Sequence, residues 1–188
     1  MHSRNPYQGF GRAAVLLTIT GACYSLWLAS LRRPVHDTLL GTIPSRALHG
    51  ALILAGDWPW WTAFPRYGFS LSTLHFAPAF LDPIGVILVF FLTYDLDSYG
   101  LELFLHGLFG VFGAYLLART FLKTFIAALA VAISFIGAGV VMTSSIAGVV
   151  HSGYMTLPWI FLSIARITKA NSVRQALGAA SLLALSLA

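Results

Sequence analysis

Charge is what this sequence has least of. Only 9% of its residues are Asp, Glu, Lys or Arg, whereas 58% are hydrophobic and the mean hydropathy is +0.82. Soluble domains carry about 25% charged residues, so this chain has too little polar surface to cover itself in water. The composition excludes an ordinary soluble protein and predicts an integral membrane protein.

The sequence also lacks a disulfide framework and the common motifs of soluble enzymes. Its single cysteine, Cys23, lies in an apolar run. There is no phosphate-binding glycine loop, no dinucleotide-binding glycine pattern, no HExxH and no GxSxG. No cleavage site follows the first apolar run, so we expect no cleaved signal peptide. The net charge of +5 gives no support for nucleic-acid binding, because in a membrane protein the basic residues follow the topology.

Long apolar runs are what the sequence does have. A membrane-spanning helix needs about 20 mostly apolar residues, and the runs predict an all-α polytopic bundle of about five spans. Their expected ranges are 12–31, 99–118, 125–150, 154–167 and 176–188. The last run is still apolar at Ala188, so we expect the bundle to continue past this residue.

A long loop separates the first two predicted spans. Residues 32–83 hold six of the eight prolines and are too polar and too broken to span. Apolar patches such as 51–54 predict short helices that lie at the membrane interface. The apolar run 83–92 is short for a span. It could be a half-helix, re-entrant or interfacial, or the start of one long bent helix.

The basic and acidic residues are distributed unequally over the predicted sides of the membrane. Seven basic residues and no acid fall on one side, namely Arg4, Arg12, Arg119, Lys123, Arg166, Lys169 and Arg174. All six acids fall on the other side, namely Asp37, Asp57, Asp82, Asp95, Asp97 and Glu102. The positive-inside rule therefore predicts a cytoplasmic N-terminus and an external long loop, in a bacterial inner membrane.

Asp37, just after the first predicted span, is the first candidate for chemistry. Its carboxylate could act as a general base or bind a divalent cation, or it could simply pair with a neighbouring arginine. Four arginines lie on the predicted external side of the membrane, where the positive-inside rule does not expect them. They are Arg32, Arg33, Arg46 and Arg66. They could bind lipid phosphate or pair with the loop acids.

Two ionisable residues lie within a predicted span. Glu102 and His106 are four residues apart, so they share one helix face. They could ligate a metal or hold a lipid phosphate, or they could form only a mutual hydrogen bond near the outer end of the helix. Gly107, Gly110 and Gly113 recur every third residue on that helix and predict close packing against another helix.

The hexapeptide Gly56–Trp61 concentrates aromatic rings around an acid and a proline. Trp58, Trp60 and Trp61 are expected to anchor the loop at the membrane–water boundary. Asp57 is then expected to form a hydrogen bond to a helix end or an ion pair with an arginine, rather than to take part in catalysis.

The order of these elements resembles a known family. Gly56, Asp57, Pro59 and Trp60 fit a loop pattern of the N-terminal part of YfhO-type bacterial polytopic membrane proteins and their relatives in the GT-C glycosyltransferase superfamily. The segment 61–64 departs from the Asn-Pro-Tyr usual there.

The resemblance implies a transferase that takes a sugar from a polyprenyl-phosphate carrier on the outer face of the membrane. Asp37 matches the family's catalytic base or metal-holding residue, and the outer-loop arginines would stabilise the leaving phosphate. Two other classes stay open: a non-catalytic membrane subunit that packs against partner proteins, and a transporter-like half with a broken segment at 83–97.

Overall fold

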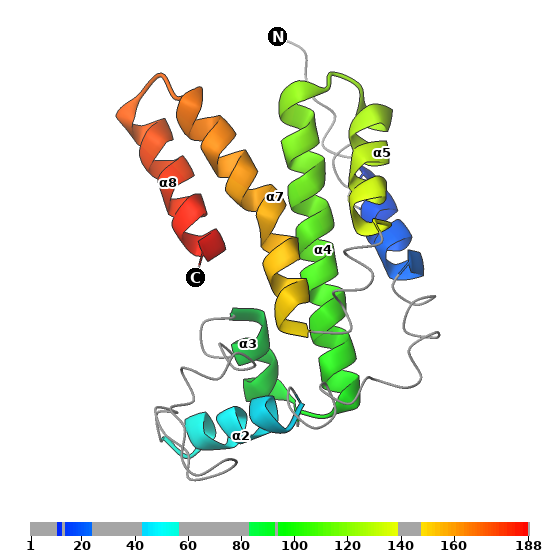
Figure 1. Ribbon diagram of the computed structural model, residues 1–188, viewed down its shortest axis with the longest axis vertical. Coiled ribbons are helices and arrows are strands. Elements are labelled where there is room, and N and C mark those ends of the chain that lie inside the picture. Colours follow the sequence, from blue (N-terminus) through cyan, green and yellow to red (C-terminus); the bar gives the residue numbers. More distant parts are fainter. Residues whose placement is uncertain are drawn as a thin grey trace. The chain divides into compact units, whose positions relative to one another are not determined.

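The computed structural model describes residues 11–12, 14–23, 43–56, 83–92, 94–138 and 148–187 (Figure 1). All regular structure in these residues is helical, which confirms the all-α class for the described part of the chain. The chain divides into two compact units. Unit 1 comprises Met1–Arg32, Gly107–Met142 and Tyr154–Leu187, and unit 2 comprises Arg33–His106 and Thr143–Gly153 together with Ala188.

The helix α4, Leu96–Phe121, is the longest described element. Its 26 residues would extend about 39 Å at 1.5 Å per residue, which exceeds the roughly 30 Å of a bilayer core. Among the described residues it is the one helix that is both long and apolar enough to cross a membrane. Two shorter apolar helices, Ala14–Cys23 and Phe125–Ile136, accompany it.

A side-chain cap at Asp95 determines where α4 begins. The Asp95 Oδ1 atom accepts hydrogen bonds from the backbone N–H of Ser98 at 2.9 Å and from its hydroxyl at 3.1 Å. These bonds hold the pKa of the Asp95 carboxyl below its ordinary value. Asp97 then lies in the first turn, where the helix dipole favours a negative charge. The helix therefore begins before the predicted start of the span at 99.

The end of α4 and the start of the next helix are also capped. Arg119 Nη1 donates to the carbonyl of Lys123 at 2.5 Å and to that of Leu122 at 3.5 Å. The hydroxyl of Thr124 accepts from the backbone N–H of Ala127 at 3.4 Å and begins α5, Phe125–Ile136.

The predicted span 125–150 is not one helix over its described residues. The helix α5 ends at Gly137, whose N–H donates to the carbonyl of Ile133 at 2.9 Å. The next helix begins at Gly148, and residues 139–147 lie outside the described part.

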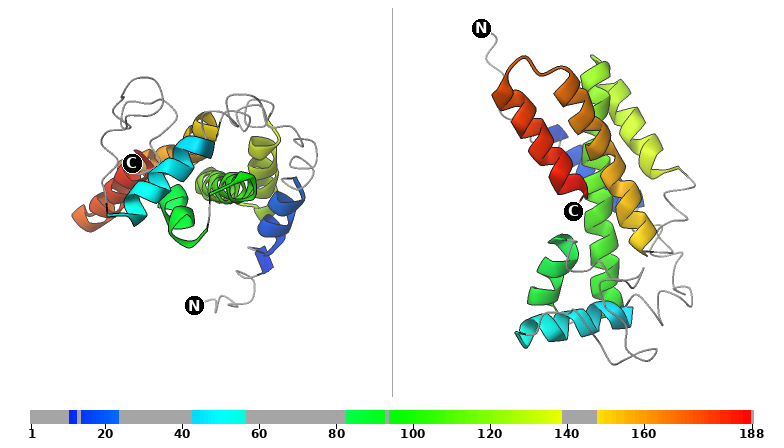
Figure 2. Two further views of the ribbon diagram at one scale, coloured as in Figure 1. Left: turned by 90° about the horizontal axis from the view of Figure 1, so that it is seen from below. Right: turned by 60° about the vertical axis from the view of Figure 1, so that its left-hand side comes forward.

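The helices α7, Gly148–Thr168, and α8, Val173–Leu187, form the last part of the chain. α8 turns back beside α7 (Figures 1 and 2). Two side chains cap its start. The Ser172 hydroxyl accepts from the Gln175 N–H at 3.3 Å, and the Gln175 side chain accepts from the Asn171 N–H at 3.0 Å. The predicted spans 154–167 and 176–188 fall within or close to these two helices.

In unit 1, glycines of α4 receive side chains of α7. A Cβ atom added at Gly113 would lie 2.5 Å from Nε1 of Trp159, and one added at Gly110 would lie 3.1 Å from Cβ of Met155. The Trp159 ring stacks on Phe109 at 4.7 Å between centroids, and its Nε1 donates to the Phe109 carbonyl at 2.9 Å. The predicted close packing at Gly110 and Gly113 is therefore confirmed.

Unit 2 contains two short helices, α2, Ile43–Leu54, and α3, Pro83–Phe91. They pack closely at Gly50, where an added Cβ atom would lie 2.5 Å from Val89 Cγ1. After α2 the chain turns at Gly56, whose φ of 78° suits glycine. The expected helix in the long loop is present as α2. The nine residues of α3 would extend only about 14 Å, which is too short for a span.

Candidate functional site

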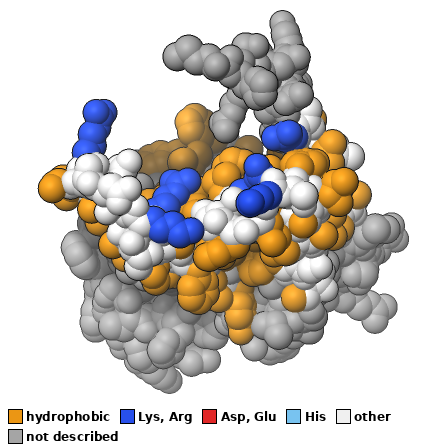
Figure 3. Space-filling view, turned by 90° about the horizontal axis from the view of Figure 1, so that it is seen from above, with side chains coloured by type: hydrophobic (Ala, Val, Ile, Leu, Met, Phe, Trp, Pro, Cys, Tyr) orange, Lys and Arg blue, Asp and Glu red, His pale blue; other side chains and the backbone are white. Residues whose placement is uncertain are grey.

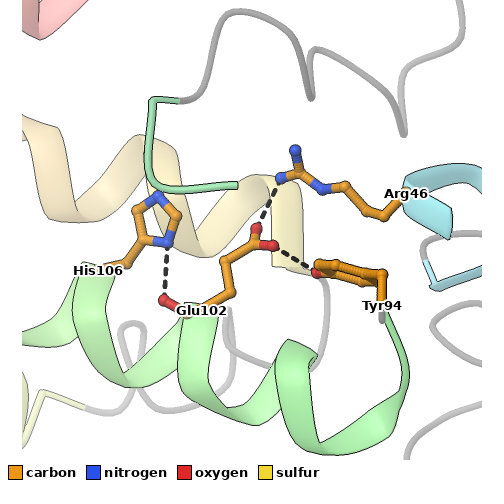
Figure 4. A network of polar contacts seen from close by, with 4 residues as sticks. All are labelled: Arg46, Tyr94, Glu102 and His106. Carbon is orange, nitrogen blue, oxygen red and sulfur yellow. Dashed lines mark hydrogen bonds and ion pairs between the residues drawn. The ribbon is translucent and has the colours of Figure 1, made fainter. Parts of the chain in front are cut away.

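A buried ion pair joins α2 to α4 in unit 2. Arg46 Nη2 donates to Glu102 Oε1 at 2.7 Å, and the two side chains are 3% and 5% exposed (Figure 4). The partners are 56 residues apart in the sequence, so the pair holds the loop helix against the long helix. Charges are almost never fully buried unless they are paired, and this pair accounts for the burial of both.

Tyr94 engages the second oxygen of the same carboxylate. Its hydroxyl donates to Glu102 Oε2, and its ring is buried just before α4 begins (Figure 4). Burial raises the pKa of the Tyr94 hydroxyl well above its ordinary value, and the negative charge of Glu102 raises this pKa further. Tyr94 therefore stays protonated and remains a hydrogen-bond donor, and its contribution to stability is lost only above the ordinary tyrosine pKa of about 10.

His106 binds the same turn of α4 through the main chain. Its Nδ1 lies 2.9 Å from the backbone carbonyl oxygen of Glu102, and the ring is buried (Figure 4). In the tautomer that donates from Nδ1, the second ring nitrogen is an acceptor. Glu102 and His106 do share a face, but their hydrogen bond uses the carbonyl of Glu102 and not its carboxylate.

The contacts of Glu102 decide what this cluster can do. One carboxylate oxygen accepts from a guanidinium and the other from a phenol, so the negative charge is compensated and both oxygens are engaged. A carboxylate whose negative charge is compensated by a buried guanidinium attracts an added proton or cation only weakly, so it is a poor general base and a poor cation ligand. We conclude that the cluster is a clamp that fixes α2 on α4.

Among the described residues, Glu102 and His106 have no third metal ligand beside them. Within the described ranges, no group of three or more His, Cys, Asp and Glu side chains is placed to hold a metal ion. A divalent cation at the glutamate–histidine pair would need ligands from the rest of the chain.

Most of the other predicted site residues lie outside the described part of the chain. These are Asp37, Arg32, Arg33 and Arg66, together with Trp58, Trp60 and Trp61. Among the four arginines proposed for lipid phosphate, Arg46 is the one that the structure describes. Its guanidinium faces Glu102 inside the protein rather than an open outer surface.

Sequence reasoning named Arg46 as a candidate but predicted neither its pairing with Glu102 nor any role for Tyr94. It considered only loop acids as partners for Arg46. The available signal was the single carboxylate inside an apolar run, since a buried acid requires a donor from somewhere in the fold. Which donor it finds depends on tertiary packing between segments far apart in the sequence.

Comparisons of the chain with protein-family models, with curated proteins and with solved structures gave no match. The described residues define a helical protein in which one helix is long and apolar enough to cross a membrane, and in which Arg46, Glu102 and Tyr94 form a buried polar cluster.

Proposed function

We propose that this chain is a polytopic integral membrane protein of a bacterial inner membrane, with its N-terminus in the cytoplasm. Support comes from the apolar length of α4 and from the charges. The described acids Asp95, Asp97 and Glu102 all belong to unit 2, whereas exposed bases lie at the helix ends of unit 1. A span of about 20 residues at 12–31 would need the helix Ala14–Cys23 to continue into residues outside the described part.

We further propose that the chain is the N-terminal membrane portion of a GT-C-like glycosyltransferase that uses a polyprenyl-phosphate sugar donor on the outer face. The observation that carries the proposal is the Arg46–Glu102 clamp. A catalytic acid in a loop needs a rigid support, and α2, which begins shortly after Asp37, is fixed to α4 by this buried pair.

The proposed chemistry is a displacement at the anomeric carbon of the sugar. Asp37 accepts the proton of the acceptor hydroxyl as its oxygen forms the new bond to the anomeric carbon. The bond from this carbon to the carrier phosphate breaks, and the phosphate leaves with the electron pair. Arg32, Arg33 and Arg66, which belong to the same loop in the sequence as Asp37, stabilise that phosphate in this proposal.

The test is Asp37→Asn in the full-length gene, followed by analysis of the cell-envelope glycans. Loss of a general base lowers the rate by about 10²–10⁴-fold, so the product glycan should disappear at unchanged protein level. Asp57→Asn is the matched control, because this loop acid is expected to bond a helix end or an arginine. An unchanged glycan profile in the Asp37 variant would refute the catalytic assignment.

A second candidate is a non-catalytic subunit that packs against partner membrane proteins. The observation in its favour is the number of large apolar side chains exposed on unit 1, such as Phe121, Ile126 and Leu177. Lipid would cover these side chains equally well. Mild detergent extraction separates the two readings: a stoichiometric complex of fixed composition supports the subunit, and a lone monomer argues against it.

A further inference from the structure

Exposed basic side chains gather at helix ends in unit 1. Six are described, namely Arg12, Arg119, Lys123, Arg166, Lys169 and Arg174. Figure 3 shows Lys and Arg side chains over an apolar surface on this face, and no Asp or Glu among the described atoms in view. The sequence of unit 1 contains no acid at all, since every acid lies between Asp37 and Glu102.

Direct contacts show which helix ends meet there. Lys169, after α7, places its Nζ 3.5 Å from the Thr120 carbonyl and 5.0 Å from the centroid of the Phe121 ring at the end of α4. Arg12 places its guanidinium carbon 5.0 Å from the centroid of the Phe125 ring at the start of α5. Positive charges from three segments are therefore held around the turn between α4 and α5.

An apolar groove of about 500 Å³ opens beside this turn. It is formed by α4, α5 and α7, all within unit 1, and its lining includes Phe121, Leu122, Val131, Phe135, Leu157 and Phe161. Along α4 it extends from Ala114 to Leu122, about 12 Å at 1.5 Å per residue. Its last lining residues, Phe121 and Leu122, are sequence neighbours of Arg119 and Lys123.

We propose that this groove and its basic rim bind an anionic phospholipid. The acyl chain lies along the apolar lining, and the phosphate is held by Lys169, Lys123 and Arg119. An ammonium carries three donors, of which Lys169 directs one to the Thr120 carbonyl, so donors remain for a phosphate oxygen. A zwitterionic lipid offers the same chains without the net negative charge, and the groove should therefore discriminate by head group.

This inference depends on the proposed membrane location but not on glycosyl transfer. The ligand is an ordinary anionic membrane lipid and not a sugar carrier. Failure of the glycan test with Asp37→Asn leaves it intact, and its own failure leaves the catalytic proposal intact.

The experiment is a lipid titration of the full chain in a neutral detergent, read out by native mass spectrometry. The two probes are dioleoyl phosphatidylglycerol and dioleoyl phosphatidylcholine, which share their chains. We expect tighter binding of phosphatidylglycerol, and a loss of about fivefold in its affinity for each of Lys123 and Lys169 that is removed. The double variant Lys123→Gln/Lys169→Gln should then lose most of the preference, while Arg174→Gln on α8 should keep it.

A second pair of variants tests the groove itself. Val131→Trp adds bulk at an exposed lining position and should reduce the binding of both lipids, whereas Ile126→Trp, exposed on the same helix outside the lining, should not. Glycerophosphoglycerol, the head group without chains, should compete weakly. Equal binding of both lipids by the parent chain, an unchanged preference in the double variant, or full competition by the free head group would each overturn the proposal.

Discussion

At the scale of the residue, the carboxylate of Glu102 links the stability of the protein to a buried charge. It is buried, and its oxygens accept from Arg46 and Tyr94. Taking a charge out of water is costly, and here the cost is offset only while the opposite charge stays in place. The cluster should therefore tolerate joint apolar replacement better than the loss of either member.

We predict that Glu102→Leu alone lowers the free energy of unfolding by about 3–5 kcal/mol, because it leaves the Arg46 guanidinium buried without its counter-ion. The double variant Arg46→Met/Glu102→Leu should recover most of this loss. The measurement is the apparent Tm and the half-life at fixed temperature in detergent. Equal losses in the single and double variants would mean that the pair is not the source of the effect.

Asp95 is predicted to make the stability of α4 depend on pH. The pKa of its carboxyl is lowered by the bonds from Ser98, so its contribution is fully present above the ordinary aspartate pKa of about 3.9 and is lost as the pH falls through the lowered value. Asp95→Ala should reduce the apparent Tm at neutral pH. Asp95→Asn should keep the cap and remove this acid-dependent loss. Identical acid profiles of the parent and the Asn variant would exclude the role.

At the scale of the element, the close approach of α4 and α7 depends on glycines. The Gly113 position has no room for a side chain, because the indole ring of Trp159 fills it. That ring also stacks on Phe109 and bonds its carbonyl, so it cannot shift without breaking two contacts.

We predict that Gly113→Ala destabilises the protein by about 1–3 kcal/mol through overpacking. Gly178→Ala is the matched control within α8, where nothing lies within 4 Å of an added Cβ atom. The control should raise stability by about 0.5–1 kcal/mol, since alanine is the better helix former. Thermal unfolding in detergent should thus shift in opposite directions for the two variants.

The helices and part of their packing follow from local sequence, whereas the polar cluster does not. The apolar run 83–92 and the apolar stretch of α4 predict α3 and α4, and the glycine spacing predicts close packing of α4 against another helix, although not that this helix is α7. The sequence contains the Asp95 that caps α4, with Ser98 three residues later, but the predicted span starts at residue 99. The clamp between Arg46 and Glu102 could not be predicted from the sequence, because it depends on the tertiary packing of α2 against α4.

At the scale of the whole molecule, acids and bases are distributed unequally along the chain: all six acids lie between Asp37 and Glu102, and nine of the eleven Lys and Arg residues lie outside that range. We predict that this distribution corresponds to two sides of a membrane. In a background with Cys23→Ala, a cysteine replacing Asp97 should react with an impermeant maleimide in intact spheroplasts, and one replacing Lys123 only after permeabilisation. Both positions are exposed, so access and not burial decides the result. Labelling of both positions from the same side would contradict the topology.

The same distribution of charges determines how the protein can be mapped by mass spectrometry. Residues 67–118 contain no Lys or Arg, so trypsin would release α3 and nearly all of α4 as one large apolar peptide ending at Arg119. That peptide carries Tyr94, Glu102 and His106 together. A tryptic digest would therefore place a label on Tyr94, Glu102 or His106 on the same 53-residue peptide, and a protease that cuts at aromatic residues is the appropriate choice to separate them.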